Sequence, residues 1–163
     1  MKPDAFIEKA KGYLPTATLE QAGTFYKNLL EKNYDPNIIR ELAKIDRWFL
    51  LVILLNRKDA VHPWLYDRCR EVEKNPDGHL DLWARGHYKS TIITYAGTIQ
   101  EILKDPNITI GIFSHTRPIA KGFLKQIKRE FEINEFLRDL FPDVCYQNPR
   151  QDSPQWSEDA GII

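Results

Sequence analysis

Residues 79–114 have the pattern of a strand, a loop, a helix and a second strand. A strong turn signal, Asn75-Pro-Asp-Gly, precedes residues 79–84, which alternate apolar and polar side chains. A helical pattern covers 89–104, a proline turn breaks it, and 108–114 is a β-rich apolar run typical of a parallel strand covered on both faces. This order predicts a βαβ unit, whose loop lies at the carboxyl end of the first strand and opens the helix.

Residues 1–75 are predicted to be helical throughout. The strongest apolar run, 48–55, is much shorter than the roughly 20 residues that a membrane-spanning helix needs, so it predicts a buried helix. Two further helices are expected, over 117–131 and 134–140. The start signals in the first region are Pro3, Thr18, Asp35-Pro36 and His62-Pro63.

Composition leaves the function open. Among the 163 residues, 23 Lys and Arg balance 23 Asp and Glu, so total charge gives no argument for nucleic-acid binding. Cys69 and Cys145 lie far apart, which predicts no disulfide or zinc framework and fits a reducing cytosol. The first residues have no pattern of a secretory signal.

Residues 85–91, Arg-Gly-His-Tyr-Lys-Ser-Thr, form the loop of the expected unit. A phosphate loop of the form GxxxxGK[ST] needs a lysine for the β- and γ-phosphates and a hydroxyl for Mg²⁺, and Lys89 and Ser90 fit these roles. The two glycine positions hold Trp83 and Tyr88. Tyr88 must therefore take a strained conformation or shift the loop. Lys-Ser-Thr at a helix start is also typical of a simple cap, and that alternative stays open.

The string 83–91, Trp-Ala-Arg-Gly-His-Tyr-Lys-Ser-Thr, resembles the variant Walker A motif of large terminase subunits, the motors that package viral DNA in bacteriophages. The likeness extends over most of 45–163, with Tyr88 departing from the family's usual glycine. The resemblance implies catalytic roles for Arg85, as an arginine finger in cis, and for Lys89, and a magnesium ligand in Ser90. The implied ATP-binding residues are Arg85, Gly86, His87, Tyr88, Lys89, Ser90 and Thr91.

The resemblance also implies a fold and partners. The fold class expected is α/β: a helical region over 1–75, then over 76–163 the first part of a P-loop NTPase sheet of the ASCE type. The implied partners are double-stranded viral DNA, a portal protein, a small terminase subunit and further copies in a ring. The implied location is the host cytoplasm, with no membrane, and the implied cofactors are ATP and Mg²⁺.

The sequence leaves catalysis by this chain open. Full-length members of the family are ATPases and endonucleases, but we expect a chain truncated before the Walker B strand and without the nuclease domain. Glu158 and Asp159 make only a weak substitute for the missing magnesium ligands. Alone, the chain should hydrolyse ATP poorly. The alternatives are another P-loop ATPase, helicase-like or kinase-like, and a catalytically dead interaction module.

A basic stripe is expected on the helix over 117–131. Arg117, Lys121, Lys125 and Arg129 recur every four residues, with Lys128 beside them, whereas apolar side chains follow another face. We expect DNA phosphate contacts from Lys121, Lys125 and Arg129, with a merely solvated face as the alternative.

Two further polar groups have both a functional and a structural interpretation. Ser114-His-Thr, at the end of the expected second strand, could face a ligand crevice or form a turn. His62-Pro-Trp could pack on adenine or simply start a helix.

Overall fold

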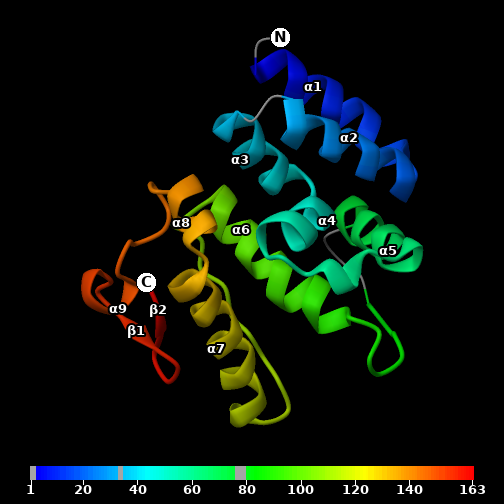
Figure 1. The fold of residues 1–163 in the computed structure, drawn as a ribbon. Helices are drawn as coiled ribbons and strands as arrows, with labels where there is room; N and C mark the ends of the chain where they lie inside the picture. Colours follow the sequence, from blue (N-terminus) through cyan, green and yellow to red (C-terminus); the bar gives the residue numbers. More distant parts are fainter. Residues whose placement is uncertain (1–2, 33–34, 76–79) are drawn as a thin grey trace. The chain divides into compact units, whose positions relative to one another are not determined.

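The computed structural model describes residues 3–32, 35–75 and 80–163 (Figure 1). The chain divides into two compact units, Met1–Leu82 and Trp83–Ile163, and each is treated by itself below. Most of the turn predicted at 75–78, and His79 of the expected first strand, lie outside the described residues.

The first unit is helical where it is described. Its long helices are α1, α2, α3 and α5, and between α3 and α5 the chain forms the short α4 and a π-helical turn, η2 (Figure 1). The bounds are α1 Pro3–Tyr13, η1 Leu14–Thr16, α2 Leu19–Lys32, α3 Pro36–Ile45, α4 Arg47–Phe49, η2 Leu50–Leu54, η3 Lys58–Ala60 and α5 Pro63–Lys74.

The predicted start signals of these helices are confirmed. Prolines begin α1, α3 and α5, where the fixed φ of proline suits a first turn and its missing N–H costs nothing. Thr18 and Gln21 form a capping box before α2: the Thr18 hydroxyl accepts from the Gln21 amide at 3.3 Å, and the Gln21 side chain accepts from the Thr18 amide at 2.9 Å. The positions at which these helices begin are therefore determined by residues next to each start.

The core of the first unit is built around the apolar run 48–55. Trp48 stacks at 6.0 Å from Tyr26 and meets Tyr66 edge-on at 5.4 Å, and its indole N–H donates to the carbonyl of Ala60 at 3.2 Å. All but one of the eight side chains in the run are buried, as predicted for a buried helix. Within the described ranges, no helix combines the length and apolarity needed to cross a membrane.

A polar network crosses this core. Asp46 is fully buried; it accepts from the Phe49 amide at 2.8 Å, from Arg70 Nη2 at 2.6 Å and from the Tyr26 hydroxyl. Arg70 also contacts Glu73, with Nη1 to Oε2 at 3.2 Å. Burial, and then the charge of Asp46, raise the pKa of Glu73 to about 7. Two carboxyl groups thus share one guanidinium inside the unit.

The second unit starts with the loop and a helix over 89–104, as predicted. The helix is π-helical in η4 (Thr91–Gly97) and α-helical in α6 (Thr98–Lys104). Helices α7 (Arg117–Ile133) and α8 (Glu135–Leu140) also agree with the sequence, and α7 packs against η4. The short α9 (Pro149–Asp152) leads to strands β1 (Trp156–Ser157) and β2 (Gly161–Ile162).

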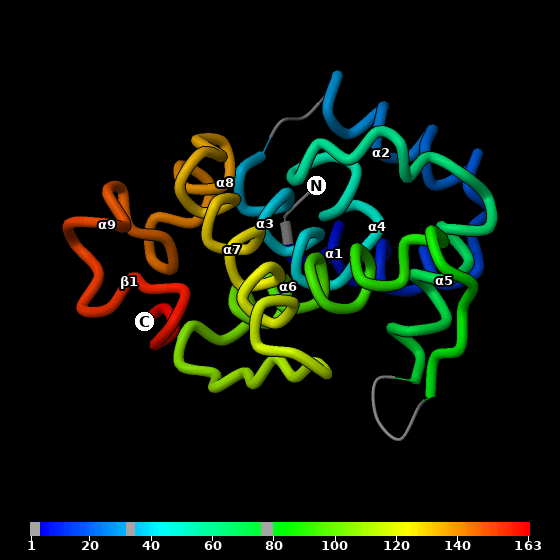
Figure 2. The backbone as a smooth tube through the Cα atoms, turned by 90° about the horizontal axis from the view of Figure 1, so that it is seen from below, coloured from blue at the N-terminus to red at the C-terminus, as the bar shows by residue number. Residues whose placement is uncertain are grey.

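The expected α/β fold class is wrong. In the described residues the only strand pairing is antiparallel, β1 with β2, joining Trp156 to Ile162, and the rest of the regular structure is helical. Residues 80–84 and 108–114, expected as parallel strands, have extended or irregular backbone without a partner strand. Figure 2 shows 108–114 as a stretch leading from α6 to α7.

The reason is that a strand needs a neighbour as well as a suitable local sequence. The side chains of 108–114 were expected to be covered on both faces, but Phe113 is 94% exposed. Leu80 and Leu82, in the first expected strand, are also exposed. No described segment pairs with either stretch.

Candidate functional site

The loop 85–91 has two residues in the left-handed region of backbone space. Gly86 has φ +83° and Tyr88 has φ +62°. Glycine adopts this conformation without penalty, whereas a side chain with a Cβ pays about 1–2 kcal/mol. Of the two alternatives that the sequence leaves for Tyr88, the structure has the strained one. Strain of this kind is typical of functional loops.

The helix begins directly after this turn. The carbonyl of Tyr88 accepts from the Ile92 amide at 2.9 Å, and Lys89 and Ser90 form the first turn of the helix. The amide of His87 donates to the Ala84 carbonyl at 3.3 Å, which closes the turn before it. The loop is therefore an ordered turn that ends at a helix N-terminus.

The predicted site residues are accessible. Arg85, Gly86, His87, Lys89 and Ser90 are exposed, whereas Tyr88 and Thr91 are half-buried. Nδ1 of His87 lies 3.2 Å from the carbonyl oxygen of Arg85. An N-terminal helix end carries a partial positive charge, and two basic side chains lie on the same short segment. This combination suits an anion such as a phosphate chain.

Magnesium fits this site only in part. The Ser90 hydroxyl stands at the helix start, where it can reach a metal that is also held by nucleotide phosphates. Across 3–32, 35–75 and 80–163, however, no group of three or more His, Cys, Asp or Glu side chains could hold a metal ion. At this site Ser90 would supply one ligand, beside nucleotide oxygens and water.

The second predicted surface is α7, and its amphipathic pattern is confirmed. Ile127 and Phe131 are buried, whereas Lys125 and Arg129 are exposed. Lys121 is half-buried and pairs with Asp159, its Nζ 2.8 Å from Oδ1. We call Arg117, Lys121, Lys125, Lys128 and Arg129 the α7 basic row.

The partner of this row is a feature that the sequence interpretation missed. Glu158 and Asp159, considered only as weak metal ligands, form the turn between β1 and β2 and face α7. Arg117 Nη2 also lies 2.8 Å from Asp159 Oδ1, and Lys128 Nζ lies 3.8 Å from Glu158 Oε1. The hydrogen bond from Lys121 lowers the pKa of Asp159, and the charge of Arg117 adds to this effect. The sequence shows the acidic pair and the basic stripe but does not show that they lie next to each other.

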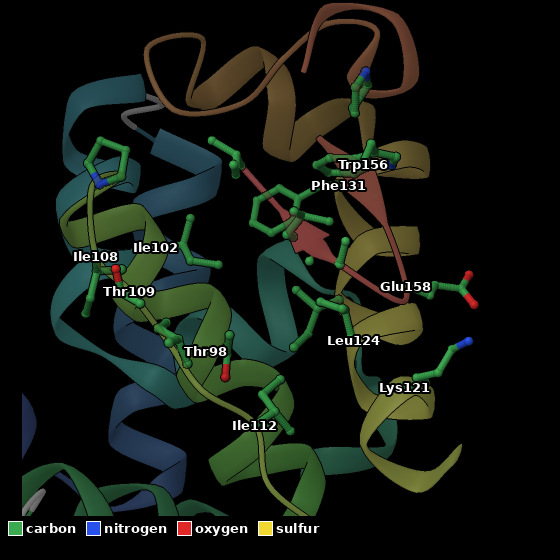
Figure 3. A pocket seen from close by; sticks show the side chains of 18 of the residues that line it. Thr98, Ile102, Ile108, Thr109, Ile112, Lys121, Leu124, Phe131, Trp156 and Glu158 are labelled. Atoms are coloured by element: carbon green, nitrogen blue, oxygen red, sulfur yellow. The ribbon is translucent and has the colours of Figure 1, made fainter. Parts of the chain in front are cut away.

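A cavity of about 720 Å³ lies beside α7 in the second unit. Figure 3 shows Leu124 and Phe131 of α7 turned toward it, with Ile108 and Ile112 of the extended segment on the opposite side. The charged ends of Lys121 and Glu158 point away from this apolar space (Figure 3). The cavity therefore separates the extended segment from α7, and at one edge it is lined by Arg117, Lys121, Glu158 and Asp159 of the charged surface.

The two remaining candidates lie at helix starts. The His62 ring accepts from the Trp64 amide at 3.2 Å and caps α5, which agrees with the structural alternative for His62-Pro-Trp. Ser114, His115 and Thr116 are exposed, and the Thr116 carbonyl accepts from the Ala120 amide at 3.3 Å as α7 begins.

Comparisons with protein-family models, with curated proteins and with solved structures found no match to this chain. The argument for function rests on the loop and on α7.

Proposed function

We propose that this chain is the ATP-binding portion of the large subunit of a viral DNA-packaging terminase. One observation carries the proposal: an ordered loop with Arg85, Lys89 and Ser90 exposed ends in left-handed Tyr88 and opens a helix of 16 residues, 89–104. Left-handed residues before a helix are typical of turns whose backbone N–H groups hold anions. The loop supports phosphate binding without a parallel sheet, which the described part of the chain does not form.

In this proposal each side chain has a defined task. The ammonium of Lys89 neutralises the β- and γ-phosphates, and the guanidinium of Arg85 binds γ-phosphate oxygens with two parallel N–H donors. The Ser90 hydroxyl is a ligand of Mg²⁺, and Gly86, His87, Tyr88 and Thr91 shape the loop around the phosphates. When bound, the metal neutralises the charge that develops on the phosphates during transfer.

The proposal also names the DNA and the protein partners of the motor. Lys121, Lys125 and Arg129 contact phosphates of double-stranded viral DNA, in the host cytoplasm. The portal protein, the small terminase subunit and further copies in a ring are the protein partners. In this proposal the chain binds ATP, and hydrolysis needs in addition an acidic magnesium ligand and a group that orients water.

A second candidate is a helical interaction module without nucleotide. The exposure of Ile108, Ile110 and Phe113 along one segment of the second unit favours it, because grouped exposed apolar side chains mark interaction surfaces. The strained Tyr88 would then mark a degenerate phosphate loop. Mg-ATP binding distinguishes the two candidates.

The test is calorimetric titration of the full chain with Mg-ATP, comparing wild type with Lys89→Ala, Arg85→Ala and Lys104→Ala. Lys104 is the matched control, since it is an exposed lysine at the other end of the same helix, paired with Glu101 at 2.7 Å. We expect the Lys89 and Arg85 variants to lose at least about tenfold in affinity, as expected for lost charge-assisted bonds. The Lys104 variant should bind like wild type.

Two results would contradict the proposal. One is a folded wild-type chain that binds no Mg-ATP at millimolar ligand, which would select the interaction module. The other is an equal loss of affinity in the Lys89 and Lys104 variants, which would show that binding follows overall charge and not the loop.

A further inference from the structure

Two cations of α7 meet on one carboxylate oxygen. Oδ1 of Asp159 lies 2.8 Å from Arg117 Nη2 and 2.8 Å from Lys121 Nζ. The two cations are one helical turn apart, whereas Asp159 lies 42 and 38 residues further along the chain. Convergence of guanidinium and ammonium donors on one oxygen is also how proteins hold a phosphate oxygen.

The acidic turn that carries Asp159 is the tip of a short hairpin, and the base of the hairpin is held on α7 by the indole of Trp156, which donates to Glu132 Oε1 at 2.7 Å. Strands β1 and β2 have two residues each, and the Ser157 hydroxyl accepts from the amides of Asp159 at 3.1 Å and Ala160 at 3.4 Å. Asp159 itself is 58% exposed in its side chain. Exposed ion pairs are weak, and salt screens them. The exposed Asp159 carboxylate can therefore be displaced from its two cations while the base of the hairpin stays on α7.

We propose that the Glu158–Asp159 turn is a built-in competitor for DNA, covering part of the α7 basic row until phosphates of double-stranded DNA displace it. The inference rests on the proposed function, which assigns DNA contact to this helix. In the covered state, Asp159 holds Arg117 and Lys121, and Glu158 lies beside Lys128. Lys125 and Arg129 are exposed, and within the described ranges they have no ion pair with the turn. They make the first contact with DNA.

The length of the row favours a polyanion over a single phosphate. From Arg117 to Arg129 the helix rises by about 18 Å, at about 1.5 Å per residue. Double-stranded DNA carries one negative charge per roughly 1.7 Å of axis, so a row of this length meets several phosphates. A single inorganic phosphate could replace only Asp159. The carboxylate of Asp159 therefore occupies the place of one phosphate group of the DNA.

The test is binding of a short DNA duplex of mixed sequence to the full chain, measured by fluorescence anisotropy over a salt series. Asp159→Asn removes the competing charge and keeps a polar side chain in the turn. Asp139→Asn is the matched control, because it makes the same change at an exposed position of α8. We expect Asp159→Asn to bind DNA about three- to tenfold more tightly than wild type, as expected for release of weak pairs. The salt slope should steepen by about one to two, for up to two freed cations.

A second substitution identifies the freed cations. Adding Lys121→Ala to Asp159→Asn should remove much of the gain, because the asparagine frees Lys121 from its ion pair and the alanine then removes the freed cation. Circular dichroism melts check that each variant is folded. The inference is overturned if Asp159→Asn binds like wild type, or if Asp139→Asn gains as much.

The outcome separates this inference from the proposed function. If no variant binds DNA while Mg-ATP binding depends on Lys89, the inference fails and the nucleotide site stands. If Asp159→Asn gains DNA affinity through Lys121 while Mg-ATP does not bind, the covered DNA surface stands and the ATP-binding proposal fails.

Discussion

The hydroxyl of Tyr95, on the helix that follows the loop, donates a 2.6 Å hydrogen bond to Oε2 of Glu130 on α7. This bond joins the helix of the proposed phosphate site to the helix of the proposed DNA surface. Glu130 also accepts from Asn134 Nδ2 at 2.6 Å, so it keeps a partner when Tyr95 loses its hydroxyl. We expect Tyr95→Phe to lower the free energy of unfolding by about 1 kcal/mol. Urea unfolding followed by circular dichroism measures it.

Tyr146→Phe is the control for this prediction. It removes a hydroxyl from an exposed tyrosine of the same unit and should change stability by less than about 0.5 kcal/mol. Equal effects of the two substitutions would mean that the bond from Tyr95 to Glu130 contributes nothing.

Stability should depend on pH through Glu73. The pKa of Glu73 is raised from 4.5 to about 7 in the folded chain, first by burial and then by Asp46. A raised carboxyl pKa favours folding below the unfolded value, and that contribution is lost as pH rises through the folded value. Stability should therefore fall between about pH 4.5 and 7. Each pKa unit corresponds to about 1.4 kcal/mol, so the loss is at most about 3.5 kcal/mol.

Glu73→Gln should flatten this pH dependence, because glutamine does not titrate and keeps an acceptor for Arg70. Glu31→Gln, at an exposed position of α2, should leave the slope as in wild type. Unfolding free energies measured across that pH window decide the point. A Glu73→Gln slope equal to that of wild type would assign the titration to another group.

The helices could be predicted because their signals are local. The side chains of Thr18 and Gln21 each accept a hydrogen bond from the other residue's amide within one turn. The rings of Pro36 and Pro63 fix φ at the first position of α3 and α5. The loop was located by the same kind of signal, since a lysine and a serine before a helical pattern lie within seven residues. For Tyr88 the sequence allows two alternatives, a strained backbone or a shifted loop. The choice between them depends on the turn around Tyr88, which the structure shows and the local sequence does not.

The remaining features depend on distant segments. Residues 108–114 have the composition of a buried strand, but composition does not supply a neighbour, and the unpaired segment leaves Phe113 exposed. The pairing of Asp159 with Arg117 spans 42 residues and depends on where a short hairpin turns. No periodic pattern in the sequence predicts a contact between residues so far apart in the chain.

The strain at Tyr88 gives a prediction that reverses the usual ranking of glycine and alanine. At φ +62° alanine keeps the Cβ penalty and glycine does not, and both remove the tyrosine ring. We expect Tyr88→Gly to be more stable than Tyr88→Ala by about 1 kcal/mol. Tyr88→Gly should also bind Mg-ATP more tightly than Tyr88→Ala does, because the backbone at position 88 can then approach the phosphates without a Cβ.

Gly86→Ala is the companion test. A Cβ at Gly86 would meet nothing within 4 Å, so any loss there comes from its φ of +83° and not from a clash. A cost of about 1–2 kcal/mol is expected. If alanine is tolerated at both positions, the left-handed turn does not persist in solution.

The corrected fold makes its own prediction at Phe113. In a strand covered on both faces this side chain would be buried, and truncating it would cost about 3–5 kcal/mol. Here it is 94% exposed, so Phe113→Ala should change the free energy of unfolding by less than about 0.5 kcal/mol. Phe131→Ala, on the buried face of α7, should show the full cost and serves as the control. Urea unfolding of both variants measures the difference, and a large loss at Phe113 would restore the expected strand.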